Sequence, residues 1–319
     1  LIIFYFMRII KPKFWDKKIS FFSAILIPLS IIYIFLSFLR KKFTITKTFN
    51  IPIICVGNIY IGGTGKTPTS MLLYKELSKL GKKPIIVKKY YKEHMDEYRM
   101  IKKNSLDLIT CKNRPDGVRE AKKFNYSTVI LDDGFQDYKI RKDINIICFN
   151  HNQLIGNGLV LPSGPLRENL NSLKTADIIL INGNENKHFE KKILDINKNL
   201  EIFYSSYKPI NLVQLKNKKF FAIAGIGNPE NFFQLIEENN LYIKKKFTFP
   251  DHYKFSKIEI QNIIDEAENN NCQLLMTEKD YFKIDQFKLR NINLLKVDLQ
   301  IDKIDKLIFK VKKIYDKNN

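Results

Sequence analysis

The fold is decided by one stretch of sequence, the apolar run Ile51-Pro52-Ile53-Ile54-Cys55-Val56 and the loop GNIYIGGTGKTP that follows it over residues 57–68. The run has the length and composition of a buried parallel strand. A helical pattern follows the loop and ends at Gly81, with apolar positions at Met71, Leu72, Leu73, Leu77 and Leu80. A strand, a glycine-rich loop ending in Gly-Lys-Thr and a helix stand in the order that a phosphate-binding loop requires.

The loop predicts a site for nucleotide phosphates, because its backbone N–H groups and the following helix N-terminus attract anions. Lys66 is expected to reach the β- and γ-phosphates, and the Thr67 hydroxyl to ligate Mg²⁺. Tyr60 stands where the general GxxxxGK[ST] pattern has glycine, which the extra glycines later in the loop partly offset. ATP and Mg²⁺ are therefore the expected cofactors. The predicted nucleotide-binding residues are Tyr60, Ile61, Gly62, Gly63, Thr64, Gly65, Lys66 and Thr67.

An acidic segment farther along the chain complements the phosphate-binding loop. Residues 127–131 have the pattern of another buried strand, and Asp132 and Asp133 follow at its end. In enzymes with this loop, a carboxylate at a strand's C-terminal end holds or orients Mg²⁺. Paired aspartates also occur as turn or cap residues. We favour the metal role, and the choice between Asp132 and Asp133 as direct ligand stays open.

An uncharged segment, Ile19–Leu39, lies between basic flanks. As a helix its 21 residues reach about 30 Å, enough to cross a hydrocarbon core. Its serines fall on one face, so one stripe can rest on protein or face lipid headgroups while the rest meets lipid. A single-span or monotopic anchor is the favoured interpretation, and a buried core helix is the alternative. Whether the segment crosses the bilayer or lies in it is left open.

The chain is strongly basic, with a formal net charge of +21. Such a charge is typical of proteins that bind nucleic acid or anionic membranes. Only eight of the 54 basic residues are Arg, however, and the abundance of Lys, Ile and Asn is also what A/T-rich codons produce. The composition excludes a disordered chain and a multi-span membrane protein. Four isolated cysteines indicate a reducing compartment.

From the loop onward, the sequence resembles the tetraacyldisaccharide 4'-kinase (lipid A 4'-kinase) family. The resemblance extends from the N-terminal apolar segment almost to the C-terminus. Its most specific string is residues 156–168, because ordinary kinases with this loop lack it. The strings that carry the resemblance are VGN…GGTGKTP (56–68), DDGFQ (132–136), GNGLVLPSGPLRE (156–168), AGIGNP (224–229) and MTEKD (276–280).

The resemblance implies transfer of the ATP γ-phosphate to the 4'-hydroxyl of a tetraacyl glucosamine disaccharide 1-phosphate, with the lipid headgroup between two α/β domains. It places a catalytic Asp at Asp96 and a His at His252, beside Lys66. A carboxylate held by an imidazole suits acceptance of the hydroxyl proton. The guanidinium of Arg167 offers a planar fork for a phosphate or a carboxylate, so Arg167 either meets phosphate or pairs with Glu168 within the protein. The substrate-contacting residues expected by resemblance are Gln136, Asn157, Gly158, Arg167 and Glu168.

The segment before Asp96 departs from the family. Lys89 stands where Arg is usual, which keeps charge but loses bidentate pairing. A family insert is largely missing, so His94 or Glu97 is an alternative base. Farther along, Arg114 and Arg119 are candidates for a phosphate contact, and the sequence does not choose between them.

We expect an α/β protein with a P-loop NTPase-type, mostly parallel sheet, a second, smaller α/β domain and an N-terminal membrane-associated helix. The expected domains are residues 1–42, 43–205 and 206–319. The last residues, 302–319, are predicted to form a packed amphipathic helix. A Gly-Ile-Gly at 225–227 is interpreted as a turn, since the full dinucleotide-binding pattern is absent.

The expected partners are an anionic glycolipid, the lipid A disaccharide 1-phosphate, and the membrane surface at the cytoplasmic face of a bacterial inner membrane. No nucleic acid and no obligate protein partner are expected. Two other protein classes would have different signals in the sequence. A GTPase switch or metallochaperone should carry a guanine-reading Asn-Lys-x-Asp motif, which is missing from the sequence. A nucleic-acid-dependent ATPase needs neither the apolar segment nor the string at 156–168.

Overall fold

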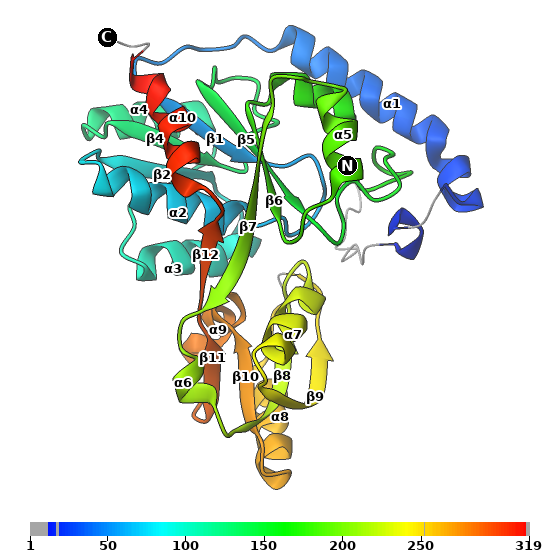
Figure 1. The fold of residues 1–319 in the computed structure, drawn as a ribbon, viewed down its shortest axis with the longest axis vertical. Coiled ribbons are helices and arrows are strands. Elements are labelled where there is room, and N and C mark those ends of the chain that lie inside the picture. The colour runs from blue at the N-terminus through cyan, green and yellow to red at the C-terminus, as the bar shows by residue number, and fades with distance from the viewer. Residues whose placement is uncertain (1–11, 17–18, 252, 317–319) are drawn as a thin grey trace. The chain divides into compact units, whose positions relative to one another are not determined.

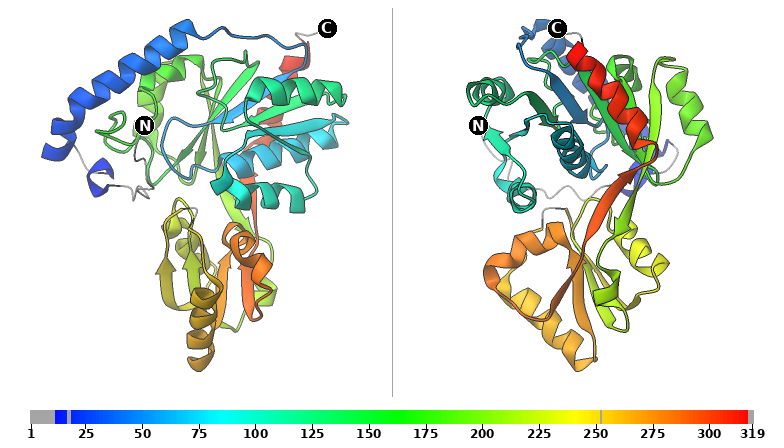
Figure 2. Two further views of the ribbon diagram at one scale, coloured as in Figure 1. Left: turned by 180° about the vertical axis from the view of Figure 1, so that it is seen from behind. Right: turned by 60° about the vertical axis from the view of Figure 1, so that its left-hand side comes forward.

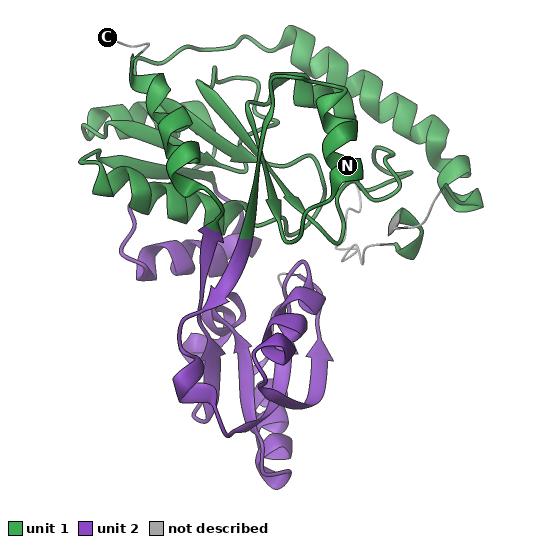
Figure 3. Cartoon of the chain, in the orientation of Figure 1, with its two compact units in different colours: residues 1–89, 109–205, 301–319 green, residues 90–108, 206–300 purple. Residues whose placement is uncertain are grey.

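The computed structural model describes residues 12–16, 19–251 and 253–316. The chain divides into two compact units, coloured separately in Figure 3. Unit 1 comprises residues 1–89, 109–205 and 301–319, and unit 2 comprises residues 90–108 and 206–300. The expected domains are continuous in sequence, whereas these units interleave. Residues 90–108 belong to unit 2, and residues 301–319 return to unit 1.

A mostly parallel sheet forms the centre of unit 1. Among the described residues it has eight strands in the order β12-β7-β6-β5-β1-β4-β2-β3 (Figure 1). The strands are β1 (Ile53–Gly57), β2 (Pro84–Lys89), β3 (Leu108–Cys111), β4 (Thr128–Asp132), β5 (Ile144–Asn150), β6 (Ile178–Asn182), β7 (Glu201–Pro209) and β12 (Val297–Ile301). Strands β7 and β12 continue into unit 2, which contains residues 206–209 and 297–300. The helices are α1 (Phe21–Phe43), α2 (Lys66–Lys79), α4 (Arg114–Lys123), α5 (Lys187–Leu194) and α10 (Ile304–Asp316), with 3-10 turns Lys13–Asp16 and Leu170–Thr175.

The central strands of unit 1 are mostly apolar because both faces of the sheet are covered. Every residue of β1 and of β4 is buried. Two apolar clusters fill unit 1, one containing Phe149 and Leu173 and the other Ile85 and Val129. The parallel β-sheet, the P-loop helix and the packed terminal helix that the sequence predicts are all present. The strand pattern therefore predicted the centre of the fold.

Unit 2 is a smaller α/β unit. Its described strands form a four-stranded parallel sheet in the order β11-β10-β8-β9. Successive residues of β8 alternate between two apolar clusters, so helices cover both faces. The strands are β8 (Lys219–Ala224), β9 (Tyr242–Thr248), β10 (Gln273–Thr277) and β11 (Ile292–Leu295). The helices are α3 (Met95–Lys103), α6 (Leu212–Leu215), α7 (Pro229–Glu238), α8 (Lys257–Asn269) and α9 (Glu278–Ile284), with 3-10 turns Lys92–His94 and Asp285–Phe287.

Helix α1 lies along the outside of unit 1 and is drawn in blue (Figure 2). It is the one helix among the described residues that is long and apolar enough to cross a membrane, by length and composition. Only 11% of its most apolar window is buried, so it is not the core helix that the alternative interpretation required. Ser23 and Ser30 are its buried residues, which confirms that the serine stripe rests on protein.

Candidate active site

The glycine-rich loop connects the end of β1 to the first turn of α2. Gly65 caps α2 with a φ of 87°, a left-handed conformation that glycine adopts without strain. Asn58 braces the loop from inside, because its Nδ2 lies 3.0 Å from Thr64 Oγ1 and 3.4 Å from the Gly62 carbonyl oxygen. Tyr60, at the departure from the general pattern, is fully buried in the apolar cluster of unit 1. Its ring thus packs in the core.

The loop and the acidic strand meet at one carboxylate. Thr67 Oγ1 donates a hydrogen bond of 2.8 Å to Asp132 Oδ2, and Asp132 is fully buried. The meeting follows from strand order, since β1 and β4 are parallel neighbours with Val56 opposite Asp132. Lys88, near the end of β2, reaches the same carboxylate with its Nζ 2.5 Å from Oδ2.

The donor set here fits a magnesium ion. Asp132 Oδ1 is buried and has no hydrogen-bond partner, and the Thr67 hydroxyl lies beside the other oxygen of the same carboxylate. These are the oxygen types that Mg²⁺ prefers. Among the described residues, no cluster of three or more His, Cys, Asp or Glu side chains could hold a metal. A partial set of protein ligands is what Mg²⁺ uses beside nucleotide phosphates, since it keeps several waters.

Asp133 has a different environment from Asp132. Its Oδ1 lies 2.9 Å from Arg167 Nη1 and 3.7 Å from Lys66 Nζ. Burial acts to raise the pKa of Asp133, but the charges of Lys66, Arg167 and Lys88 outweigh it and hold that pKa well below its usual range. Asp133 is therefore a permanent carboxylate that orders the cations around the loop.

Arg114 and Arg119 have separate roles. Arg114 Nη2 donates to the carbonyl oxygens of Asp132, at 3.3 Å, and Asp133, at 2.6 Å, so it shapes the acidic turn. Arg119 pairs with Asp116 on the exposed side of α4.

The predicted substrate residues lie in or beside the segment 156–168, which is internally braced. Asn157 Nδ2 donates to the Ser163 carbonyl oxygen at 2.9 Å, and Gly158 has a positive φ of 78°. Tyr138 donates to Glu168 at 2.5 Å, so Glu168 does not pair with Arg167. Gln136 donates to the Asn58 carbonyl oxygen at 2.8 Å.

Helix α1 is hydrogen-bonded to this same segment. The Ser30 hydroxyl lies 2.9 Å from the Val160 carbonyl oxygen and 2.8 Å from Ser163 Oγ, and it accepts a bond from the Ser163 N–H at 3.0 Å. Tyr33 donates to the carbonyl oxygen of Arg167 at 3.2 Å. The apolar helix thus holds the segment that carries Arg167.

In unit 2, Asp96 is buried in the first turn of α3. Lys279 of α9 lies 3.9 Å from Asp96, 3.2 Å from Glu97 and 3.0 Å from Asp251. Burial acts to lower the pKa of Lys279, but these three carboxylates raise it well above its usual range. The ammonium is therefore charged near the predicted base. His252, the other predicted member of this pair, lies outside the described residues.

Three residues of these sites were missed by sequence reasoning. The sequence places Asn58 and Lys279 within motifs but does not indicate their contacts. It places Lys88 in a segment that differs from the family pattern. The signal for Lys88 was a charge directly after the apolar run 85–87. A lysine at that place is buried only if a partner on the neighbouring strand meets it.

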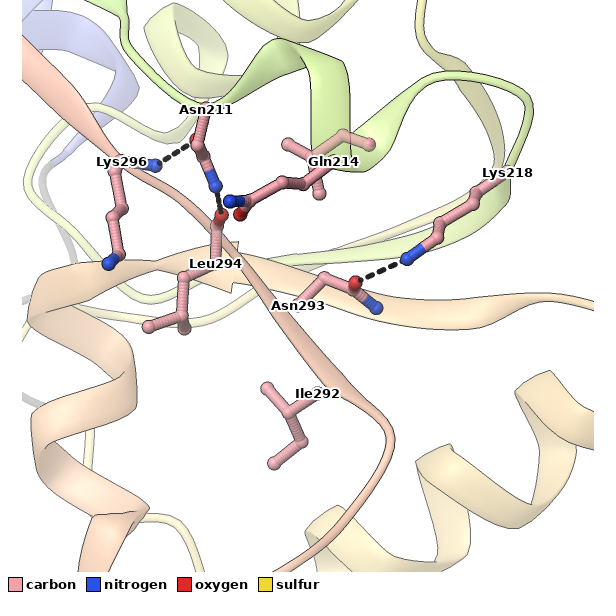
Figure 4. A pocket seen from close by; sticks show the side chains of 8 residues that line it. Asn211, Gln214, Lys218, Ile292, Asn293, Leu294 and Lys296 are labelled. Atoms are coloured by element: carbon pink, nitrogen blue, oxygen red, sulfur yellow. Dashed lines mark hydrogen bonds between the residues drawn. The ribbon is translucent and has the colours of Figure 1, made fainter.

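A pocket of about 300 Å³ lies elsewhere in unit 2 (Figure 4). Its polar groups are paired with one another, since Asn211 Nδ2 donates to the Leu294 carbonyl oxygen at 2.8 Å and Lys218 Nζ to Asn293 Oδ1 at 3.2 Å. These groups are satisfied internally, and we assign the pocket no ligand.

Comparison with known proteins agrees with this geometry. Residues 22–314 match the family described as LpxK, Tetraacyldisaccharide-1-P 4'-kinase. A tetraacyldisaccharide 4'-kinase of Pelagibacter ubique (strain HTCC1062) is 38% identical over 98% of this chain and 100% of its own length. One of Rickettsia bellii (strain OSU 85-389) is 34% identical over 87% of this chain and 90% of its own.

The fold also matches a solved structure. The crystal structure of LpxK from Aquifex aeolicus in complex with ATP superposes with a TM-score of 0.70, covering 91% of this chain and 99% of that one at 24% identity. At this identity the likeness supports the fold. The family is shown by the match over residues 22–314 and by 38% identity to a curated kinase over nearly the full length of both chains. The chain belongs to the tetraacyldisaccharide-1-P 4'-kinase family.

Proposed function

We propose that this protein is a lipid kinase that transfers the γ-phosphate of ATP to the 4'-hydroxyl of a tetraacyl glucosamine disaccharide 1-phosphate, in lipid A biosynthesis. The observation that carries the proposal is the hydrogen bond from Thr67 to the buried Asp132, which joins the phosphate-binding loop to the acidic strand. Membership of the kinase family supplies the substrate class.

The site residues of unit 1 each have a role in nucleotide binding. The loop amides of residues 60–67 and the Lys66 ammonium hold the phosphates. Thr67 and Asp132 would hold Mg²⁺, which would supply positive charge to offset that of the phosphates. Asp133 keeps Lys66 and Arg167 in place from the side of the β4 turn. We assign direct ligation to Asp132 because its Oδ1 has no hydrogen-bond partner and its Oδ2 lies beside the Thr67 hydroxyl.

Asp96 accepts the proton of the attacking sugar hydroxyl, with His252 as the second catalytic residue that the family resemblance implies. Phosphoryl transfer demands mainly positioning and charge stabilisation, with one group to orient the hydroxyl. The support is the burial of Asp96 next to the charged Lys279. A nearby cation keeps a buried carboxylate ionised at neutral pH, and only the ionised form accepts a proton.

The lipid substrate and α1 support an association of the enzyme with a membrane. The helix exposes large apolar side chains such as Phe21, Ile31 and Phe35, each more than half exposed, while its serines face protein. Arg40, Lys41 and Lys42 end the helix and suit an anionic surface. We infer association with the cytoplasmic face of the inner membrane, where ATP is available.

The proposal is tested with γ-labelled ATP and a tetraacyldisaccharide 1-phosphate in detergent micelles. We expect label in the lipid with the natural chain, none with α-labelled ATP, and none with a lipid whose 4'-hydroxyl is methylated. An active preparation that hydrolyses ATP but never labels the lipid would remove the kinase assignment.

A further inference from the structure

Lys88 is a buried charge to which the reaction assigns no role. It lies on β2 at the position opposite Asp132 on β4, so the sheet itself places the two side chains at one edge. Lys88 is 4% exposed and Asp132 is fully buried. A lysine this deeply buried is stable only when it is paired.

The contacts of Lys88 are those expected of a metal ion at this place. Its Nζ lies 2.5 Å from Asp132 Oδ2 and 3.2 Å from Thr67 Oγ1. These two groups are the protein ligands that we assign to Mg²⁺, so the ammonium and the metal share both partners. A divalent ion bound to them would stand within a few ångströms of a like charge, and the two cations would repel each other.

We propose that Lys88 is an internal cation that competes with the divalent metal ion for Asp132 and Thr67. Metal binding then displaces the ammonium from Oδ2, and Lys88 weakens the coupling between metal and nucleotide. Its role is positioning: in the absence of the metal, it holds the buried carboxylate in place. The inference rests on the proposed nucleotide and metal site.

Two features make the exchange feasible. The side chain of Lys88 is long and unbranched, so its ammonium can withdraw while the strand stays in place. Asp132 Oδ1 has no hydrogen-bond partner, so the carboxylate retains one oxygen for the metal before the ammonium leaves the other. The metal can therefore bind Oδ1 before the ammonium has left Oδ2.

The test compares ADP affinity with Mg²⁺ and with EDTA, by titration calorimetry on the full chain without lipid. The ratio of the two affinities measures the metal's contribution. We expect Lys88→Met and Lys88→Gln to raise this ratio about tenfold, because the competing charge is gone. Lys88→Arg, which keeps the charge, should leave it within about twofold. Lys122→Met is the control for loss of one exposed lysine in unit 1.

Lys88→Gln can still hydrogen-bond both partners, so it keeps the test available if Lys88→Met does not fold. Thermal unfolding without nucleotide gives a second readout: Mg²⁺ should raise the melting temperature of the neutral variants more than that of the natural chain. A ratio that is unchanged or lower in the neutral variants overturns the competition. Failure of the natural chain to bind ADP would overturn the proposed function itself, and the competition with it.

Discussion

Thr67 and Asp132 lie 65 positions apart in sequence, yet the Thr67 hydroxyl donates a 2.8 Å hydrogen bond to the Asp132 carboxylate. The contact exists because β1 and β4 are adjacent parallel strands whose carboxyl ends share one edge of the sheet. It brings the hydroxyl of the phosphate-binding loop and a buried carboxylate to one point. The nucleotide site is thus set by strand order as much as by the loop itself.

Lys66 is proposed to bind the nucleotide phosphates through its positive charge. Lys66→Met should lower kcat about 10²-fold or more, as loss of a preorganised charge at a reacting group does. The steady-state rate of lipid phosphorylation is the measurement. Lys79→Met, an exposed lysine of the same helix, should leave kcat within about twofold. Equal rates for both variants would show that Lys66 does not act on phosphate.

Asp133 should make stability depend on pH. Its folded pKa is lower than the usual carboxyl pKa of about 4, so its contribution is present above pH 4 and is lost as the pH falls further. Asp133→Asn should lower the free energy of unfolding by about 1–3 kcal/mol at pH 7. The deficit should shrink below pH 4, as measured by urea unfolding in detergent.

The control for Asp133 is Asp116→Asn, which removes an exposed partner of Arg119 and should cost less than about 1 kcal/mol. A deficit for Asp133→Asn that stays constant down to pH 3 would show that the carboxylate is not ionised with a lowered pKa.

Ser30 should hold the segment 156–168 against α1. Ser30→Val leaves the buried Ser163 N–H without its partner, a cost of about 1–3 kcal/mol, while the Val160 carbonyl oxygen keeps its bond from the Gly164 N–H. Hydrogen exchange of the Ser163 amide in micelles should then become faster. Ser37→Val, on the same helix, should not change it. If Ser163 exchanges equally in both variants, α1 does not brace the segment.

Lys279 should favour the ionised form of the proposed base, Asp96, in unit 2. Removing its charge with Lys279→Met raises the pKa of the neighbouring carboxylates Asp96, Glu97 and Asp251, since an adjacent cation favours their ionised form. The acid limb of the kcat/KM profile should move to higher pH, with kcat lowered about tenfold. Lys279→Arg should restore the profile and the exposed Lys257→Met should not alter it. If the acid limb of the kcat/KM profile does not move, Lys279 does not act on the base.

The sequence predicted the elements whose signals are local. Glycine spacing identified the loop, and apolar runs identified β1 and β4 to within two residues. The serine face of α1 was also visible, because helical periodicity reports which side of a helix differs. These features need no knowledge of distant residues.

The features that were missed depend on contacts between distant strands. Lys88 is an ordinary surface residue by sequence, and only its register opposite Asp132 explains its burial. The interleaved units have the same origin, since residues 301–319 join unit 1 through tertiary contacts such as that of Tyr315 with Thr128, 2.7 Å between hydroxyl oxygens. The pairing of Arg167 with Asp133 rather than with adjacent Glu168 also required the folded chain.

The most direct test of the central claim is the position of the phosphate in the lipid product. The natural chain is incubated with ATP, Mg²⁺ and tetraacyldisaccharide 1-phosphate, and the product is examined by mass spectrometry and phosphorus NMR. We expect one added phosphate, on the 4'-oxygen, and far less of this product from Lys66→Met. A phosphate at another hydroxyl, or an unchanged lipid beside consumed ATP, would contradict it.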